Sequence, residues 1–266
     1  MIQLPKEYLY KIKELGQVFE DTTCYTVMQG IGGSAWVDEI EEPNYAISAY
    51  GDFCFFAGKP TEDFKQDDLL DLLKKLHKEK VLFIPETKEW TVFFEDNTNF
   101  YSLDRYRLKK RKEPFDRVLL KKYVEKLPAG FQIEAIDEKW HAKLQKEDWG
   151  ADLCGMIPSA KEYVEHAVGF LVTKDGVPAA GISSYSYYDK GVEIQVDTKK
   201  EFRRLGLATI LGARFILECM ERNLYPNWDA ANPISLRTAE KLGYEFDKIY
   251  KAFSNMEIKE MKLGDA

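Results

Sequence analysis

The sequence has no run of about 18 apolar residues, the length a helix needs to cross a bilayer, so no membrane-spanning helix is expected. Its first residues show no basic segment followed by an apolar one, which argues against a signal peptide. Only four cysteines occur, and they lie far apart, with no CxxC pair and no histidine at metal-ligand spacing. These absences predict a cytoplasmic protein with reduced, buried cysteines and no metal.

The chain also lacks an excess of positive charge, because 38 lysines and arginines face 45 aspartates and glutamates, for a net charge of −7. Nucleic-acid binding relies on a basic face that replaces phosphate counterions, so this balance argues against a nucleic-acid partner. One basic run, Lys109-Lys110-Arg111-Lys112, is more typical of a solvated surface than of a binding patch. An acidic protein more easily accepts a cationic substrate.

Prolines are few, ten in 266 residues, and there is no low-complexity tract, as in an ordinary globular protein. The length suits one large domain or two small ones. Pro128-Ala129-Gly130 separates a predicted helix, 116–127, from an alternating strand, 131–136. We therefore expect two domains, 1–128 and 129–266, and find no sequence repeat that relates them.

The N-terminal half has the pattern of a mixed α/β domain. Two short strands, 45–50 and 53–57, are joined by Gly51-Asp52 as in a hairpin. A leucine-rich amphipathic helix is predicted over 62–79, followed by a buried strand over 81–84. No chemistry can be assigned to this half from its residues.

In the C-terminal half, apolar and polar residues follow a more regular pattern, which predicts the element order β-α-α-β-β-β-α-β-α-β. Its predicted elements are a strand at 131–136, helices near 137–148 and 159–165, strands at 169–173, 177–188 and 191–198, a helix at 204–222, a strand at 226–229, a helix at 233–242 and a strand-rich end at 244–258. We expect a mixed sheet covered by helices.

One strand in this half leads directly into a glycine-containing helix start. The strand ending Val196-Asp197-Thr198 is followed by Arg203-Arg204-Leu205-Gly206-Leu207-Ala208-Thr209. A helix amino terminus presents unpaired N–H groups and a partial positive charge, which favours phosphate binding. Gly206 and Ala208 have little or no side chain, so a phosphate can approach the backbone closely there. Arg203 and Arg204 can add charge-assisted contacts.

A second element begins the next helix. Asn232 is placed to cap it, Pro233 takes the first helical position, and Gly243 supplies a left-handed end. Because Asn232 follows a predicted strand directly, its side chain should lie beside whatever occupies the space between that strand and the preceding one.

Together, the segments E-I-Q-V-D-T, R-R-L-G-L-A-T and N-P-I-S-L-R-T-A-E-K-L-G-Y, between Glu193 and Tyr244, resemble the GNAT superfamily of N-acetyltransferases in order and spacing. The resemblance implies an α/β (α+β) GNAT acyl-CoA N-acyltransferase fold with a mixed central sheet. With its large N-terminal extension and its E-I-Q-x-x-T segment, the chain also resembles the zwittermicin A resistance-type acetyltransferases, which pair a GNAT domain with a smaller, degenerate GNAT-like α/β domain.

The resemblance implies that acetyl-CoA is the cosubstrate. Backbone amides of the helix start would hold its pyrophosphate, the preceding strand would pair with the pantetheine arm, and Asn232 and Ser235 would touch that arm from the other side. The residues expected to bind it are Val196, Asp197, Thr198, Arg203, Arg204, Leu205, Gly206, Leu207, Ala208, Thr209, Asn232 and Ser235.

Glu193 is the predicted catalytic base, acting directly or through a water, because family members often use a glutamate on the matching strand. It shares a strand face with Gln195 and Asp197. The alternative is a structural or substrate-contacting carboxylate. His141 and His166 are weaker candidates for a substrate contact.

The sequence departs from the common family pattern at the general acid. Ala239 stands where many members carry a tyrosine, and Tyr244 is expected to be a packing residue. The acid is then another tyrosine, with Tyr185, Tyr187 and Tyr188 as candidates, or none is required, since a thiolate is a fairly stable leaving group.

These features predict an acetyltransferase acting on a primary amine, with a small molecule as the favoured acceptor. Two alternatives remain open: an acyl-CoA-binding sensor without catalysis, and a protein or peptide N-acetyltransferase. The N-terminal half either completes the acceptor pocket or forms a homodimer interface.

Overall fold

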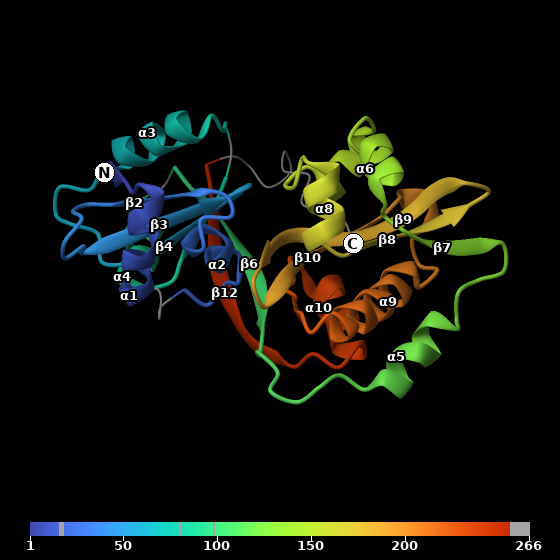
Figure 1. Cartoon of the computed structure of the whole chain (residues 1–266). Helices are drawn as coiled ribbons and strands as arrows, with labels where there is room; N and C mark the ends of the chain where they lie inside the picture. The colour runs from blue at the N-terminus through green and yellow to red at the C-terminus, as the bar shows by residue number, and fades with distance from the viewer. Residues whose placement is uncertain (16–18, 80, 98, 256–266) are drawn as a thin grey trace. The chain divides into compact units, whose positions relative to one another are not determined.

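In the computed structural model, residues 1–266 are described except for 16–18, 80, 98 and 256–266. The chain divides into two compact units (Figure 1). The first holds Met1–Arg105 and the end of the last strand from Tyr250, and the second holds Tyr106–Ile249. The divisions fall within β6 (Tyr101–Leu108) and β12 (Phe246–Ser254), so residues 106–128, expected in the N-terminal domain, belong to the second unit.

A seven-stranded sheet in the order β1-β2-β3-β4-β5-β12-β6 forms the centre of the first unit. Its other strands are β1 (Ile2–Gln3), β2 (Ser34–Val37), β3 (Tyr45–Tyr50), β4 (Phe53–Gly58) and β5 (Leu82–Pro85), and its helices are η1 (Lys6–Lys11), α1 (Ile12–Leu15), α2 (Thr23–Met28), α3 (Gln66–Leu76) and α4 (Lys88–Glu95). Strands β1 to β4 are antiparallel, and β5 runs parallel to β4. The predicted hairpin and buried strand are therefore present.

Helix α3 is shorter than the sequence predicted. It begins after Lys65, whose backbone N–H donates to the Asp68 carboxylate at 2.8 Å, and it ends at His77 with a left-handed backbone (φ 52°). Its apolar face packs Leu69, Leu72 and Leu73 onto the sheet, in a core rich in aromatic rings. This burial fixes the connection between β4 and β5.

The second unit is built on a five-stranded sheet in the order β11-β10-β9-β8-β7. Its strands are β7 (Phe131–Ala135), β8 (Gly169–Lys174), β9 (Val177–Tyr188), β10 (Gly191–Thr198) and β11 (Tyr225–Asn227), and its helices are α5 (Arg117–Val124), α6 (Glu138–Leu144), α7 (Asp148–Cys154), α8 (Ala160–His166), η2 (Lys200–Phe202), α9 (Leu207–Glu221) and α10 (Pro233–Lys241). Strands β7 to β10 are antiparallel and β11 is parallel to β10. The predicted element order is confirmed, with one more short helix before β8.

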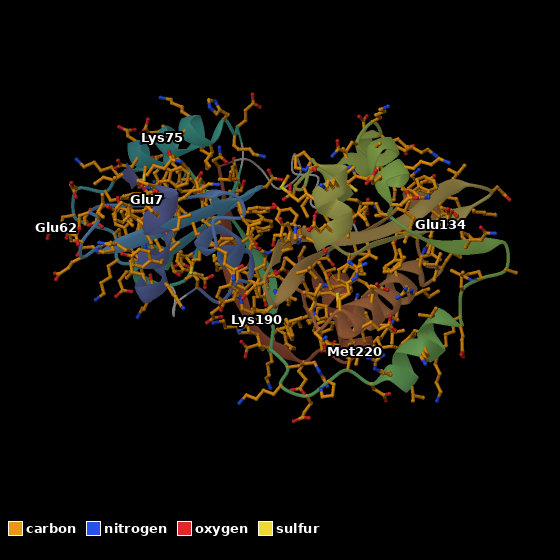
Figure 2. The ribbon with its side chains drawn as sticks, viewed as in Figure 1. Glu7, Glu62, Lys75, Glu134, Lys190 and Met220 are labelled. Carbon is orange, nitrogen blue, oxygen red and sulfur yellow. The ribbon has the colours of Figure 1, made fainter. Side chains whose placement is uncertain are left out.

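Helices cover both faces of this sheet (Figure 1). One face carries α9 and α5 over the larger apolar core, which includes Val192 and Ile194 of β10. Met220 of α9, labelled in Figure 2, is among the half-buried side chains packed against it. The other face carries α6, α7 and α8 over a smaller core around Leu171. Because β10 alternates, Glu193 points to this second face.

The two units share one connectivity. From β1 in the first unit and from β7 in the second, a strand leads through three short helices to three antiparallel strands, and the chain returns through a helix to a fifth strand parallel to the fourth, followed by one more helix. In this comparison α3 corresponds to α9, and β5 corresponds to β11. The duplication is visible in the topology, whereas the sequence shows no repeat.

Among the described helices, none has the length and apolar character required to traverse a bilayer. All four cysteines are buried and free, as expected.

Candidate functional site

Strands β10 and β11 pair only briefly before they separate. Their parallel register joins Gly191 to Tyr225, Val192 to Pro226 and Glu193 to Asn227, where β11 ends. Strand β10 continues to Thr198 with β9 on its other side, and no described strand pairs with its outer edge beyond Glu193. Backbone N–H and C=O groups on such an edge can pair with an extended ligand. The edge contains the predicted residues Val196, Asp197 and Thr198.

The loop after β10 ends at the amino terminus of α9. Gly206 caps this helix with a left-handed backbone (φ 78°), and no described side chain accepts a hydrogen bond from its first turn. The first intrahelical bond comes from the N–H of Ile210 to the carbonyl of Gly206, at 3.1 Å. The preceding amides therefore point along the axis of a 15-residue helix and form an anion-binding site.

Four other helices of the same unit begin with a side-chain cap. Side chains of Asp116, Asp137, Ser159 and Asn232 accept backbone hydrogen bonds at the starts of α5, α6, α8 and α10. In the first unit, the topologically equivalent helix α3 carries Asp67 and Asp68 in its first turn. These carboxylates already complement the helix dipole and would repel a phosphate. Between α3 and α9, only α9 presents a first turn suited to an anion.

Two arginines lie in the loop that precedes this turn. Arg203 is half-buried, and its Nε donates to the carbonyl of Thr198 at 3.2 Å, which ties the loop to the end of β10. Arg204 is exposed and has a left-handed backbone (φ 66°), a conformation that costs a non-glycine residue about 1–2 kcal/mol. Leu207 and Thr209 are buried, so they face a ligand only through their backbone.

Glu193 lies at the point where the two strands separate. Its side chain is only 6% exposed, and its Oε2 accepts a hydrogen bond from Nδ2 of Asn227 at 2.5 Å. The structure therefore holds the predicted base in a fixed position beside the open edge. A buried carboxylate in such a position can accept a proton from a ligand that enters between the strands.

Sequence reasoning missed the partners of Glu193 on β11. Side chains along β10 and β11 alternate between the two faces of the sheet, and Glu193 pairs with Asn227. Tyr225 and Asn227 therefore face the same side as Glu193. Burial raises the pKa of Tyr225, and the nearby charge of Glu193 raises it further, while its hydroxyl accepts the backbone N–H of Arg111 at 3.0 Å. The signal was present, since Y-P-N-W follows a long helix, but the predicted strand began one residue late.

The predicted cap at the start of α10 is confirmed. Oδ1 of Asn232 accepts the N–H groups of Ile234 and Ser235, each at 2.9 Å. The Ser235 hydroxyl is buried and accepts a hydrogen bond from Nε1 of Trp228 at 3.0 Å. Both side chains thus have structural partners, although the Ser235 hydroxyl keeps its own proton for another acceptor.

The tyrosine expected to pack and two of the tyrosines considered as acids have different surroundings. Tyr244 is buried and its hydroxyl donates to the carbonyl of Pro226 at 2.6 Å, which confirms its packing role. Tyr187 donates to Oε1 of Glu162 at 2.8 Å and stacks on His166, with ring centroids 5.0 Å apart. Tyr185 is the residue of β9 that is skipped in the pairing with β10.

The remaining predicted histidine contact is structural. His141 is buried, and its Nε2 lies 2.9 Å from the carbonyl oxygen of Ile157. Glu134 of β7, labelled in Figure 2, accepts hydrogen bonds from Nε1 of Trp140 and Oγ1 of Thr173. These contacts fix the helices on the Glu193 side of the sheet. Within the described residues, no cluster of three or more metal-ligating side chains is found.

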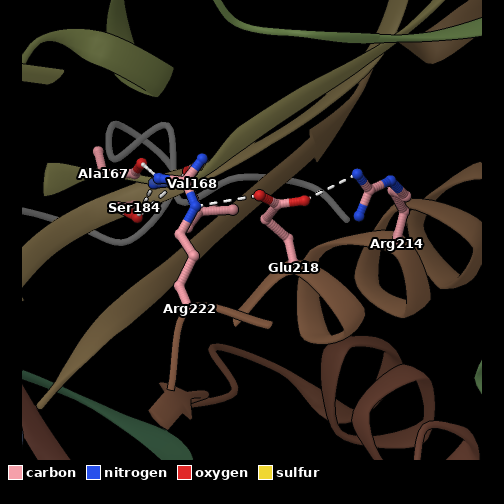
Figure 3. Close-up of polar contacts among 6 residues, drawn as sticks. All are labelled: Ala167, Val168, Ser184, Arg214, Glu218 and Arg222. Carbon is pink, nitrogen blue, oxygen red and sulfur yellow. Dashed lines mark hydrogen bonds and ion pairs between the residues drawn. The ribbon is translucent and has the colours of Figure 1, made fainter. Parts of the chain in front are cut away.

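A polar network at the far end of α9 ties this helix to the segment before β8 (Figure 3). Glu218 accepts hydrogen bonds from Nη2 of Arg214 at 2.8 Å and from Nε of Arg222 at 3.0 Å. Arg222 also donates from Nη1 to the carbonyl of Ala167 at 3.0 Å. Next to it, Ser184 of β9 accepts the N–H of Val168 at 2.9 Å. The network connects α9 with the end of α8.

Comparisons with known protein families, sequences and structures all match this chain to GNAT acetyltransferases. The profile of the GNAT acetyltransferase family matches residues 13–253. A crystal structure of a GCN5-related N-acetyltransferase-like protein from Streptococcus suis is 34% identical, covers 93% of this chain and 98% of its own, and superposes with a TM-score of 0.84. An uncharacterized N-acetyltransferase, YdfB of Bacillus subtilis, is 25% identical over 88% of this chain and 92% of its own.

A tandem GNAT protein from the clavulanic acid biosynthesis pathway shares the fold at 10% identity, with a TM-score of 0.57 over 95% of this chain and 97% of its own. These matches extend across both compact units, so the motifs of the second unit alone did not produce them.

Proposed function

This chain belongs to the GNAT acetyltransferase family, and from that premise we propose that it transfers the acetyl group of acetyl-CoA to a primary amine of a small molecule. The observation that carries the proposal is the separation of β10 from β11 at Glu193, next to the uncapped start of α9. An open strand edge suits an extended amide-containing arm, and an uncapped helix suits a phosphate. Acetyl-CoA has both features in one molecule.

In this proposal the backbone amides of residues 204–209 hold the pyrophosphate, and the exposed cation of Arg204 adds a charge-assisted contact. The pantetheine arm pairs with the outer edge of Val196–Thr198, and Asn232 borders the arm from the α10 side. The uncapped turn and the unpaired edge support this placement. Acetyl-CoA supplies the thioester carbonyl that the amine attacks.

Glu193 then acts as the base. It takes one proton from the ammonium form of the acceptor, so that the neutral nitrogen can attack the carbonyl carbon of the thioester. The C–N bond forms, the C–S bond breaks, and the thiolate of CoA leaves. The burial of Glu193 and its hydrogen bond from Asn227 support this role, because both keep the carboxylate in one orientation.

A small acceptor is favoured over a peptide by the acidic balance of the chain, since a net charge of −7 attracts small cationic amines. The free, buried cysteines support a cytoplasmic location. The first unit is proposed to be a degenerate copy of the second. Its β4 and β5 pair over four residues, and its α3 carries carboxylates where α9 presents amides. We therefore expect one acetyl-CoA site per chain.

The purified protein should be incubated with acetyl-CoA and a panel of polyamines, amino sugars and lysine-containing peptides, with the release of free thiol as readout. Amine-dependent release with small amines preferred would support the proposal. A preference for peptides would overturn the small-molecule acceptor while leaving the acetyltransferase intact. Calorimetry should give a stoichiometry near one acetyl-CoA per chain. Failure to bind acetyl-CoA would contradict the assigned site.

A further inference from the structure

Arg107 of β6 is a buried cation on the Glu193 side of the second unit's sheet. Tyr106 and Leu108, on either side of it, pack into the larger apolar core, which lies on the α9 side. Because side chains alternate along a strand, Arg107 points to the opposite side. Glu193 points the same way, since its own neighbours in β10 also belong to that core.

A short antiparallel bridge places Arg107 beside the chain that follows β11. The backbone N–H of Tyr106 donates to the carbonyl of Ala230 at 3.0 Å, and the N–H of Ala230 donates to the carbonyl of Tyr106 at the same distance. The residues next to such a pair are opposed, so Arg107 stands against Asp229. Asp229 lies between Trp228 and Ala230, which are both buried in the core on the α9 side, and its half-buried side chain is directed to the other side.

Charged groups therefore lie on both sides of the point where β10 and β11 separate. Glu193 lies on the β10 side, opposite Asn227, and Arg107 lies beyond β11, next to Asp229. Strands are spaced by about 4.8 Å and residues within a strand by about 3.3 Å, so two strands and two residues separate Glu193 from Arg107 by about 12 Å. An amine held at Glu193 thus has a cation within reach of a short carbon chain.

Arg107 can hold Asp229 and a ligand at the same time. A buried arginine needs an anionic neighbour, and Asp229 is in place to be one. A guanidinium has five N–H donors in a planar fork, whereas one carboxylate takes two of them. The same fork matches the geometry of a second carboxylate. Arg107 and Glu193 each retain a small exposed area, 7% and 6%, through which a ligand can reach them.

We propose that Arg107 binds a carboxylate of the acceptor, so that the substrate is an ω-amino acid, with its amine at Glu193 and its carboxylate at Arg107. This inference rests on the proposed function and narrows its class of small primary amines. A separation of about 12 Å favours groups at opposite ends of a carbon chain over an α-amino acid, whose amine and carboxylate share one carbon atom. Arg107 is then a specificity-determining residue, which selects the amine and takes no part in the transfer itself.

The first test compares acceptors that differ in one group. Each ω-amino acid is paired with the alkylamine of the same chain length, and kcat/KM is measured for both. The wild type should prefer the best amino acid at least about tenfold, because the alkylamine leaves the guanidinium without its anion. Arg107→Met should abolish this preference, and Arg107→Lys, which keeps the charge but loses the planar fork, should reduce it. The ratio is taken within one preparation, so a partly unfolded variant does not distort it.

Arg105→Lys is the matched control, because Arg105 is a second buried arginine of β6 and has protein partners. Its Nε donates to the hydroxyl of Tyr250 at 3.0 Å, and its guanidinium lies 5.1 Å from the centroid of the Phe53 ring. The substitution should lower the melting temperature and leave the preference for amino acids over alkylamines as in the wild type. An equal loss of preference in Arg105→Lys and Arg107→Lys would indicate a general disturbance of β6 and overturn the inference.

A second readout does not require turnover. Calorimetry in the presence of CoA should show that the preferred ω-amino acid binds Arg107→Met at least about tenfold more weakly than the wild type, while CoA itself binds both equally. If the wild type binds the amino acid but releases no thiol from acetyl-CoA, the proposed transfer is at fault and the carboxylate site stands. If amino acids and alkylamines release thiol equally well, the transferase stands and the inference fails. The absence of both amino-acid binding and thiol release also overturns it.

Discussion

Asn227 Nδ2 donates a 2.5 Å hydrogen bond to Oε2 of Glu193, and this bond joins the last residue of β11 to the last residue of β10 that β11 pairs with. The strands separate immediately beyond it. The same contact therefore closes the paired part of the two strands and orients the carboxylate that faces the opening.

Asn227→Ala should reduce kcat by about tenfold, because a hydrogen bond to a charged group contributes about 1.5–3 kcal/mol and Glu193 would lose its orientation. Acetyl-CoA affinity should change little, since Asn227 lies outside the expected phosphate and pantetheine contacts. Steady-state kinetics and calorimetry separate the two effects. Asn227→Asp places a second carboxylate against Glu193 and should lower kcat further. A variant that lost only acetyl-CoA affinity would contradict this assignment.

Gly206→Ala should weaken acetyl-CoA binding by at least about tenfold, because a Cβ at the start of α9 would stand where phosphate approaches the amides. The protein itself offers no obstacle, since nothing lies within 4 Å of that Cβ. The left-handed backbone (φ 78°) should also cost about 1–2 kcal/mol of stability.

Gly176→Ala is the control for Gly206→Ala. Gly176 lies in the β8–β9 turn with φ 75° and equally open surroundings. Thermal unfolding should show a similar loss of stability in both variants, whereas calorimetry should show weaker acetyl-CoA binding only in Gly206→Ala. Equal affinities would place the phosphates elsewhere.

Arg204→Gly should make the protein more stable and at the same time weaken its binding of acetyl-CoA. Glycine relieves the left-handed strain at φ 66°, so the free energy of unfolding should rise by up to about 1 kcal/mol. Loss of the exposed cation should at the same time raise the KM for acetyl-CoA several-fold, with the largest effect at low salt. Arg204→Lys keeps both the charge and the strained backbone. It should therefore show neither the full gain in the free energy of unfolding nor the full rise in the KM for acetyl-CoA. An unchanged KM at low salt would remove Arg204 from the site.

Glu218→Gln tests the network in Figure 3. Burial alone would raise the pKa of Glu218, but hydrogen bonds from Arg214 and Arg222 outweigh it and lower the pKa below its usual value. A folded pKa below the unfolded value of about 4.3 means that the carboxylate stabilises the protein above that pH, and that this stabilisation is lost as the pH falls through the folded pKa.

The substitution should therefore cost about 1–2 kcal/mol near pH 7, between the values for an exposed ion pair and a hydrogen bond to a buried charge. Denaturant unfolding should show this difference shrinking as the pH falls below about 4.3 and disappearing once the pH is well below the folded pKa of Glu218. A difference that stayed constant across this range would mean that packing, and not the charge of Glu218, stabilises the network.

Local patterns in the sequence determined much of the second unit. Apolar alternation placed the strands, and the Asn232 cap and the Gly206 helix start were visible because capping and backbone conformation depend on a few neighbouring residues. Glu193 was selected on the resemblance to the family, whose members often use a glutamate on the matching strand. The family followed from these segments and is confirmed by the match over residues 13–253.

Contacts between distant residues were decided by the tertiary structure. The pairing of Glu193 with Asn227 depends on the register of β10 with β11, and its pairing with Ser186 depends on a one-residue bulge at Tyr185. Neither register has a local signature, because strand pairing is set by the packing of whole faces and not by the residues at one position. The Ser235 hydroxyl shows the same limit, since its partner Trp228 lies outside its helix.

The division of the chain into two units, and the topology that they share, could not be predicted from the sequence. The compact units divide within β6 and β12, and not at Pro128-Ala129-Gly130, although that segment has the composition of a linker. The shared connectivity of the two units left no repeat in the residues, because many apolar sequences satisfy one backbone topology. The sequence thus determined which residues can carry the chemistry, and the tertiary structure decided which of them lie together, because only long-range packing brings separate strands into register.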